Sequence, residues 1–103
     1  MILVHIPWHV NPFRGDRFVE VWADAAEAVL DYGAVSWGFY RAVDGRLDFI
    51  QQAVFPSKAH FERYWYSEEI SEARALAAGL FQVPVLPVWH GVVSAAEVEA
   101  LSA

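Results

Sequence analysis

The sequence predicts an α+β fold of the ferredoxin-like type, in which helices cover one face of a four-stranded antiparallel sheet. The first observation is the order of the element signals, which reads strand, helix, strand, hairpin, strand, helix, strand within 103 residues. The second is the length, which suits a single domain over residues 1–103. The third is a hydrophobic content of 56%. A domain this small has much surface per unit volume, so we expect a second copy of the chain or a flat apolar ligand to cover part of it.

Charge and composition argue against several classes of protein. The net charge is −6 and Lys58 is the only lysine, so the clustered basic side chains of a nucleic-acid-binding face are missing. The chain has no cysteine, which rules out disulfides and thiolate metal sites. No apolar run approaches the roughly 20 residues of a membrane span. The first residues lack the basic region and cleavage site of a signal peptide. We therefore expect a cytoplasmic protein without a membrane or nucleic-acid partner.

The first predicted strand covers residues 2–10, because both of its faces are largely apolar. One face carries Ile2, Val4, Ile6, Trp8 and Val10, and the other carries Leu3, His5, Pro7 and His9. Pro7 cannot donate a ladder hydrogen bond, which predicts a bulge or a locally unpaired stretch at this position.

A helix is predicted from Asp16 to about Tyr32, with Asp16 as its N-cap and Gly33 as its stop. The residues that share its apolar stripe are Phe18, Val21, Trp22, Ala25 and Val29. The opposite stripe is acidic, which is typical of a helix face in contact with water.

Two strands joined by a tight turn are predicted next, over residues 34–43 and 47–55. Asp44 and Gly45 form a strong hairpin signal. Gln51 and Gln52 interrupt the second of these strands and must point to opposite faces. A buried glutamine needs hydrogen-bond partners, so the inward one is expected either to orient a ligand or to bond a neighbouring side chain.

The second helical region begins after Pro56 and Ser57. The side chains that gather on one side of it are His60, Phe61, Tyr64 and Trp65. Ser67 and the two glutamates that follow it indicate a fresh helix start, and that helix runs to Gly79.

The last strand is predicted over residues 83–93, where Pro84 and Pro87 favour an edge position or a bulge. The segment from Ser94 to Glu97 matches a capping box. A short helix with Val98 and Leu101 inward is therefore expected at the end of the sequence.

The segment Phe55-Pro56-Ser57, followed by Phe61 and then by Tyr64 to Glu69, carries a resemblance to a known family. It resembles the dimeric α+β barrel superfamily, and within it the antibiotic-biosynthesis-monooxygenase-like branch. The resemblance implies a homodimer whose two sheets join into a barrel, with a small aromatic or polyketide ligand held between sheet and helices. Some such proteins oxygenate this ligand without metal or flavin, so no cofactor is expected.

The same resemblance places Trp65 on the wall of the ligand pocket. The haem-degrading branch would need a histidine on the helix after the motif, where this chain has Arg74. It would also need an asparagine in the first strand, where Pro7 and Trp8 stand. Both differences argue against haem degradation, and Arg74 is instead expected to pair with a ligand carboxylate or phenolate.

The candidate catalytic residues are His60, Tyr64 and Arg74. His60 would assist deprotonation, and Tyr64 and Arg74 would stabilise the developing oxyanion. The candidate ligand-binding residues are Trp65, Gln51, Trp22 and His90. The alternative is that the aromatic members of this set are ordinary core residues and that His60 is a half-exposed helix residue.

A metal site is the weaker interpretation of the histidines. His5, His9 and His90 could supply three imidazoles, because the last strand neighbours the first in this fold. Residues four apart on one strand face lie roughly 13 Å apart, however, which is too far to share one ion without a bend. No metal site is therefore predicted. The serines lack a nucleophile elbow, and phosphate-binding and dinucleotide-binding loops are absent from the sequence.

Two functions remain open on the sequence. The first is a cofactor-independent monooxygenase that acts on a small aromatic, polyketide or quinol-type compound. The second is a dimeric barrel protein that binds a small ligand, or fills its cavity with side chains, without chemistry. The fold by itself does not choose between them.

Overall fold

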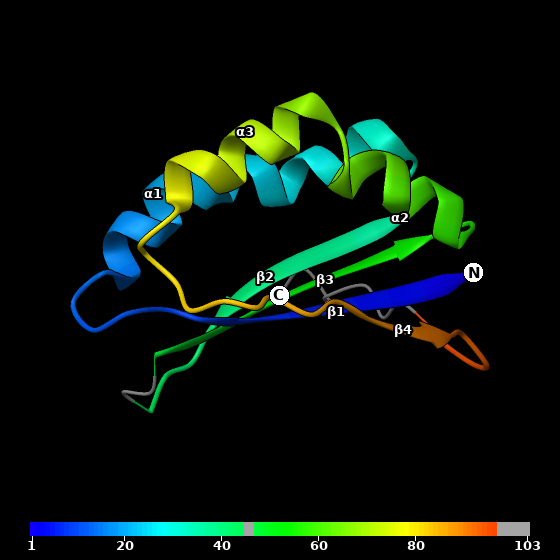
Figure 1. Cartoon of the computed structure of the whole chain (residues 1–103). Helices are drawn as coiled ribbons and strands as arrows, with labels where there is room; N and C mark the ends of the chain where they lie inside the picture. The colour runs from blue at the N-terminus through cyan, green and yellow to red at the C-terminus, as the bar shows by residue number, and fades with distance from the viewer. Residues whose placement is uncertain (45–46, 97–103) are drawn as a thin grey trace, which may run out of the picture.

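The structure is a computed structural model of the chain, and it describes residues 1–44 and 47–96. A four-stranded antiparallel sheet with the strand order β2-β3-β1-β4 forms one layer, and the helices form a second layer on one face of it (Figure 1). The strands are β1 (Ile2–His9), β2 (Ser36–Arg41), β3 (Asp48–Phe55) and β4 (Val88–Gly91). The helices are α1 (Gly15–Glu27), the 3-10 helix η1 (Ala28–Tyr32), α2 (Lys58–Trp65) and α3 (Glu68–Ala77). This order and topology confirm the predicted ferredoxin-like α+β fold.

Strand β1 lies in the middle of the sheet and shows the predicted alternation. Val4, Ile6 and Trp8 are buried under the helices, whereas His5 and Pro7 point to the other face. The pairing of β1 with β3 runs from Ile2 to His9 without a bulge. Strand β4 pairs only with Ile2 to His5, so Pro7 lies where β1 has β3 alone beside it. The missing donor of Pro7 is thus accommodated by the short length of β4.

The first helix differs from the prediction at its start. It begins at Gly15, with Arg14 as N-cap, and Asp16 lies in its first turn. The Asp16 carboxylate accepts a hydrogen bond at 2.7 Å from the Arg41 guanidinium of β2, so it ties the helix to the sheet and does not cap the helix. The predicted apolar stripe is confirmed, because Phe18 and Trp22 are fully buried.

The end of this helical region agrees with the prediction. The 3-10 helix η1 continues α1 to Tyr32, and Gly33 then takes a left-handed conformation with φ of 92°. A Cβ at this position would lie 2.9 Å from the His60 ring carbon Cδ2, so a side chain here would also meet α2.

The second helical region divides at Tyr66 and Ser67, as predicted. Ser67 is the N-cap of α3, and its hydroxyl accepts a hydrogen bond from the Ile70 backbone N–H at 3.2 Å. Trp65 is the last residue of α2, and the break at Tyr66 lets α3 run across the sheet beside α1 (Figure 1).

The last strand is shorter than predicted. It covers Val88–Gly91 at the edge of the sheet, whereas the prediction extended from residue 83 to residue 93. Residues 83–87 pair with no strand, and Pro84 and Pro87 have no N–H with which to form a ladder. The predicted edge position is confirmed. Gly45, Glu97, Val98 and Leu101 lie outside the described residues.

The two faces of the sheet are covered unequally. The helices cover one face, and no element of residues 1–44 and 47–96 covers the other (Figure 1). We call this second side the open face, and its side chains include Leu3, His5, Pro7, His9, Tyr40, Ile50, Gln52, Val54, Val88 and His90. In the described part of the chain, no helix is both long enough and apolar enough to cross a membrane.

Candidate functional site

A cleft of about 730 Å³ lies between α3 and the segment that connects α3 to β4. Its walls are mainly apolar, with Trp65, Phe81, Val83 and Val85 among the lining residues. Arg74 is the one charged residue of the lining. A concave apolar site with a single cation suits a small ligand that has a flat apolar body and a polarised or anionic oxygen.

Three segments bring the walls of this cleft together. Trp65 comes from the end of α2, Arg74 from the last turns of α3, and Phe81 from the irregular segment that follows Gly79. Phe81 forms an isolated antiparallel bridge with Val10, just past the end of β1. The cleft therefore depends on the helix layer and on the connection to β4 together.

Arg74 is held in place by its neighbours. Its Nη1 donates a hydrogen bond to the Trp65 backbone carbonyl at 2.7 Å, and its guanidinium carbon lies 4.4 Å from the Trp65 ring centre. This stacking is a cation–π contact. Nη2 makes a longer contact of 3.4 Å with the Ser71 hydroxyl. The Arg74 side chain is thus positioned before any ligand arrives.

The charge of Arg74 is not balanced within the described residues. Burial lowers the pKa of its guanidinium, with opposite contributions from Tyr64 and Tyr66, but an arginine remains charged at neutral pH. None of the ion pairs formed by residues 1–44 and 47–96 includes Arg74. A partly desolvated cation without an anion favours a ligand that supplies one.

A chain of buried hydrogen bonds joins Trp22, Gln51 and Tyr64. We call it the closed chain because each of these side chains has its partner within the protein. The Trp22 indole N–H donates to the Gln51 side-chain oxygen at 2.8 Å, and the Gln51 amide donates to the Tyr64 hydroxyl at 3.0 Å. The Tyr64 hydroxyl in turn donates to the Ala25 carbonyl at 2.7 Å. Burial raises the pKa of Tyr64 far above its usual range, partly opposed by the bond from Gln51. These side chains join α1, β3 and α2, and none of them lines the cleft.

His60 lies apart from the cleft. It belongs to the first turn of α2, whereas Trp65 ends that helix. Its Nδ1 is hydrogen-bonded to the Ser57 hydroxyl at 2.7 Å, and its ring lies against Gly33. The structure therefore brings Trp65 and Arg74 together, and it does not bring His60 to them.

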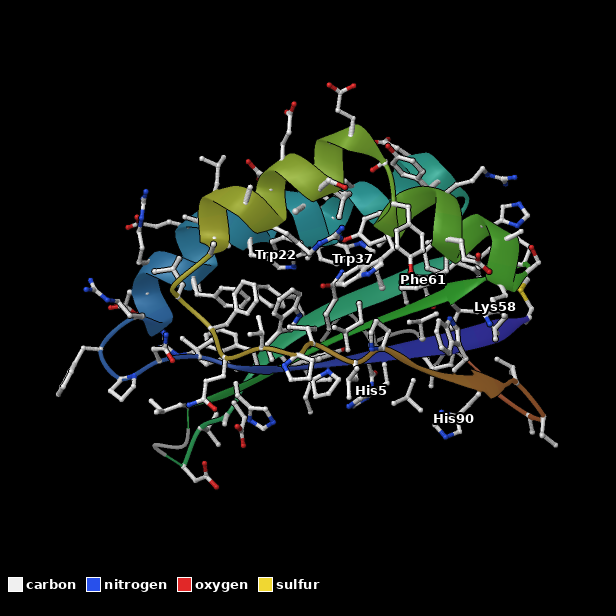
Figure 2. The ribbon with its side chains drawn as sticks, in the orientation of Figure 1. His5, Trp22, Trp37, Lys58, Phe61 and His90 are labelled. Atoms are coloured by element: carbon white, nitrogen blue, oxygen red, sulfur yellow. The ribbon has the colours of Figure 1, made fainter. Side chains whose placement is uncertain are left out.

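His90 lies on the open face, opposite the helices. Figure 2 shows Trp22 and Phe61 between helices and sheet, with His5 and His90 on the other side of the sheet. His9 is paired there with Asp48 at 2.8 Å, and His5 contacts Gln52 at 3.2 Å. Residues 1–44 and 47–96 contain no group of three or more His, Asp or Glu side chains that could hold a metal ion.

Phe81 is the part of the cleft that the sequence interpretation missed. It lies between the predicted second helical region and the predicted last strand, where no periodic pattern places it on a face. Its large apolar side chain soon after Gly79 was the one available signal, because the chain must fold back onto the sheet at this point to reach β4.

Comparison with known proteins gives structural matches only. No family model matches the chain, and the search of curated proteins found no match. Forty-six chains of solved structures match it. One is described as a candidate antibiotic biosynthesis monooxygenase from Nitrosomonas europaea; it has a TM-score of 0.82 and 14% identity, over 91% of this chain and 100% of that one.

A candidate enzyme of the same description from Deinococcus radiodurans has a TM-score of 0.79 and 9% identity, over 97% of this chain and 100% of the other. The chain has the fold of these proteins. The predicted structural likeness to antibiotic-biosynthesis-monooxygenase-like proteins is therefore confirmed. A protein from Methanosarcina mazei, described only as conserved, also matches, with a TM-score of 0.75 and 14% identity over 86% of this chain and 89% of the other. Sequence identities this low establish the fold alone. The activity has to be inferred from the residues of the cleft.

Proposed function

We propose that the protein is a cofactor-independent monooxygenase that binds a small planar aromatic or quinol-type compound in the cleft beside Trp65 and Arg74. The observation that carries this proposal is the Arg74 guanidinium, stacked at 4.4 Å on Trp65 in an apolar cleft and without an anionic partner among the described residues. The description of fold neighbours as candidate monooxygenases is consistent with it.

In this proposal Trp65 and Phe81 form part of the apolar wall against which the ligand ring packs, and Arg74 binds the ligand oxygen. The cation favours the phenolate or enolate form, so the ligand loses its proton to water at the open mouth of the cleft. Preorganised stabilisation of a developing oxyanion is commonly the largest catalytic term.

An electron-rich enolate can then react with dioxygen directly. In an anthrone-type substrate the enolate carbon derives from a CH₂ group; it forms a bond to dioxygen and takes a proton from water to give a hydroperoxide, which loses water to leave a carbonyl. One oxygen atom enters the product and the other leaves as water, and all four electrons come from the substrate CH₂ group and its bonds to hydrogen. The reaction as proposed therefore needs no cofactor.

This assignment changes the roles given to two predicted catalytic residues. Tyr64 donates its one hydroxyl proton to the Ala25 carbonyl, so in the proposal it supports the wall behind Trp65 and does not contact the ligand. His60 lies outside the cleft lining, so it is not used as the base. Gln51 and Trp22 hold Tyr64 in place, and His90 is left without a role in the reaction.

The test is oxygen uptake with 2,6-dihydroxyanthrone, corrected for the reaction without protein. Arg74→Gln should lower the protein-dependent rate by about 10²–10³-fold, because it removes the oxyanion partner. Arg63→Gln, on the exposed side of α2, is the matched control and should keep the rate. A rate lost in His60→Gln and kept in Arg74→Gln would restore His60 as the base and overturn the proposal. Binding without turnover would favour the alternative of a ligand-binding protein.

We also propose that the chain forms a homodimer through its open face. Apolar side chains of this face are exposed in the single chain, with Ile50 at 36%, Val88 at 44% and Tyr40 at 55%. Apolar side chains gathered on an exposed face mark an interaction surface, and a second copy packed sheet on sheet would cover this one. Sedimentation should give twice the chain mass of 11.6 kDa.

A matched pair of variants locates the contact. Ile50→Glu on the open face should yield a monomer. Val19→Glu on the outer side of α1 should not, although Val19 has the same exposed fraction of 36%. A wild-type chain that stays monomeric at micromolar concentration would contradict the homodimer proposal.

A further inference from the structure

The indole N–H of Trp8 is a buried donor without an acceptor. The Trp8 side chain is fully buried, and its Nε1 has no hydrogen-bond partner among the described residues. No other side-chain nitrogen or oxygen atom in residues 1–44 and 47–96 is buried and unpaired in this way. A buried donor without an acceptor lowers stability, so its presence in the middle of the core calls for a physical reason.

The neighbouring Trp22 shows that the same core can satisfy an indole. Trp22 is also fully buried, and its ring centre lies 4.8 Å from that of Trp8. Its N–H donates to Gln51 at 2.8 Å. The lack of an acceptor is therefore specific to Trp8 and is not a general property of this aromatic core.

Trp8 lies directly behind the inner wall of the cleft. Its ring centre is 4.9 Å from Phe81, which it meets edge to face, and 6.2 Å from Trp65. Phe81 and Trp65 both line the cleft and are only 9% and 8% exposed. One layer of aromatic side chains thus separates the Trp8 ring from the space assigned to the ligand.

Phe81 is attached to the sheet through its neighbours' backbone. The Asn11 N–H donates to the Leu80 carbonyl and the Gln82 N–H donates to the His9 carbonyl, each at 2.8 Å. Neither bond involves the Phe81 side chain, whose ring packs against Trp8 and Phe18 with ring centres 4.9 and 6.1 Å away. Contact between a ligand and Trp8 would require this ring to turn while the two backbone bonds stay in place.

We propose that Trp8 is a ligand-binding residue, and that its N–H binds an oxygen at the inner edge of the ligand while Arg74 binds an oxygen at the outer edge. The inference rests on the proposed function of the cleft and narrows its substrate class. The Trp65 ring centre is 6.2 Å from that of Trp8 and 4.4 Å from the Arg74 guanidinium carbon, so both donors are near neighbours of Trp65. The ligand is therefore a flat molecule of two or three fused rings with oxygens on opposite edges.

Nuclear magnetic resonance of the indole N–H groups tests this inference. The five tryptophans of the ¹⁵N-labelled chain give five indole signals, which Trp→Phe variants assign. The probes are 2,6-dihydroxynaphthalene, with oxygens on opposite edges, and 2-naphthol, with one oxygen. The first probe should move the Trp8 N–H proton downfield, as expected for a new hydrogen bond, and leave the Trp22 signal in place.

Affinity provides the second readout. One additional hydrogen bond corresponds to roughly a tenfold change in dissociation constant, so 2,6-dihydroxynaphthalene should bind about tenfold more tightly than 2-naphthol. Trp8→Phe should abolish this preference. If that variant does not fold, the Trp8 signal of the unmodified chain decides.

The outcomes separate the two proposals. If both probes bind in an Arg74-dependent way with equal affinity and the Trp8 signal stays in place, the inference about Trp8 is wrong. The proposal that the cleft binds a ligand is then still supported. The Trp8 N–H would then rest against a neighbouring ring. If neither probe binds, both the proposed function of the cleft and the inference about Trp8 are wrong.

Discussion

The Trp22–Gln51–Tyr64 chain and the Trp65–Arg74 cleft are built from similar residues but satisfy their polar groups differently. In the chain every side-chain donor has a partner within the protein. Beside the cleft, Arg74 has no anionic partner and the Trp8 N–H has no acceptor among the described residues. A closed network stabilises and orients a core, whereas an incomplete one leaves interactions for a ligand to supply.

Trp65 lines the cleft and is also part of the aromatic core, and its removal should have the largest effect. Its ring stacks on Phe61 at 5.7 Å, and its exposed fraction is only 8%. Trp65→Ala should lower the free energy of unfolding by roughly 3–5 kcal/mol, measured by urea denaturation. Trp65→Phe should keep most of the stability and lose most of the fluorescence quenching by a bound naphthol. A small loss of stability in Trp65→Ala would show that the ring is not part of the core.

Gln51→Leu should break the closed chain without affecting the cleft. The substitution leaves the buried Trp22 N–H without an acceptor, which should lower the free energy of unfolding by roughly 1–3 kcal/mol. The affinity for 2,6-dihydroxynaphthalene should stay the same in titration calorimetry. A large fall in affinity would mean that the two regions act as one site.

Arg74→Gln should weaken ligand binding and leave the stability of the chain almost unchanged. Its contact with the Trp65 carbonyl is a partly exposed hydrogen bond, so stability should fall by at most about 1 kcal/mol. The affinity for 2,6-dihydroxynaphthalene should fall by about tenfold or more, because a charged donor is lost. The exposed Arg63→Gln is the matched control and should change neither quantity.

Alkaline pH should lower the free energy of unfolding through Tyr64 of the closed chain, by less than the substitutions described above. Burial raises the folded-state pKa of Tyr64 above its ordinary value of about 10.0. Below pH 10 the folded and unfolded chains both keep this proton, and above it the unfolded chain loses the proton first. Stability should therefore fall as pH rises above 10. This decline should be shallower in Tyr64→Phe when unfolding is measured at pH 9 and pH 11. An equal decline in both proteins would argue against Tyr64 as its source.

Periodicity was sufficient to predict the layers of this fold. Alternation in residues 2–10 placed Val4 and Trp8 on the same face of the strand, which the structure shows to be the buried one, and the spacing of Phe18 and Trp22 gave the buried stripe of α1. Ser67 carried enough local information to predict the start of α3. These features depend on neighbours in the sequence or on the repeat of one element.

Features that depend on distant partners could not be predicted in the same way. Asp16 was expected to cap a helix, but it lies in the first turn of α1 and binds Arg41 of strand β2. Tyr64 was expected to be catalytic, and its hydroxyl is bonded to Ala25 and Gln51, whose proximity only the folded chain creates. Phe81 reaches the cleft through an irregular connection, and no periodic signal describes such a path.

The central claim is that the cleft beside Arg74 binds a ligand and that the Trp22–Gln51–Tyr64 chain does not. Titration calorimetry of 2,6-dihydroxynaphthalene into the unmodified chain, Arg74→Gln and Gln51→Leu tests it most directly. We expect equal dissociation constants for the unmodified chain and Gln51→Leu, and one at least about tenfold weaker for Arg74→Gln. Unchanged binding in Arg74→Gln together with lost binding in a folded Gln51→Leu would contradict the account.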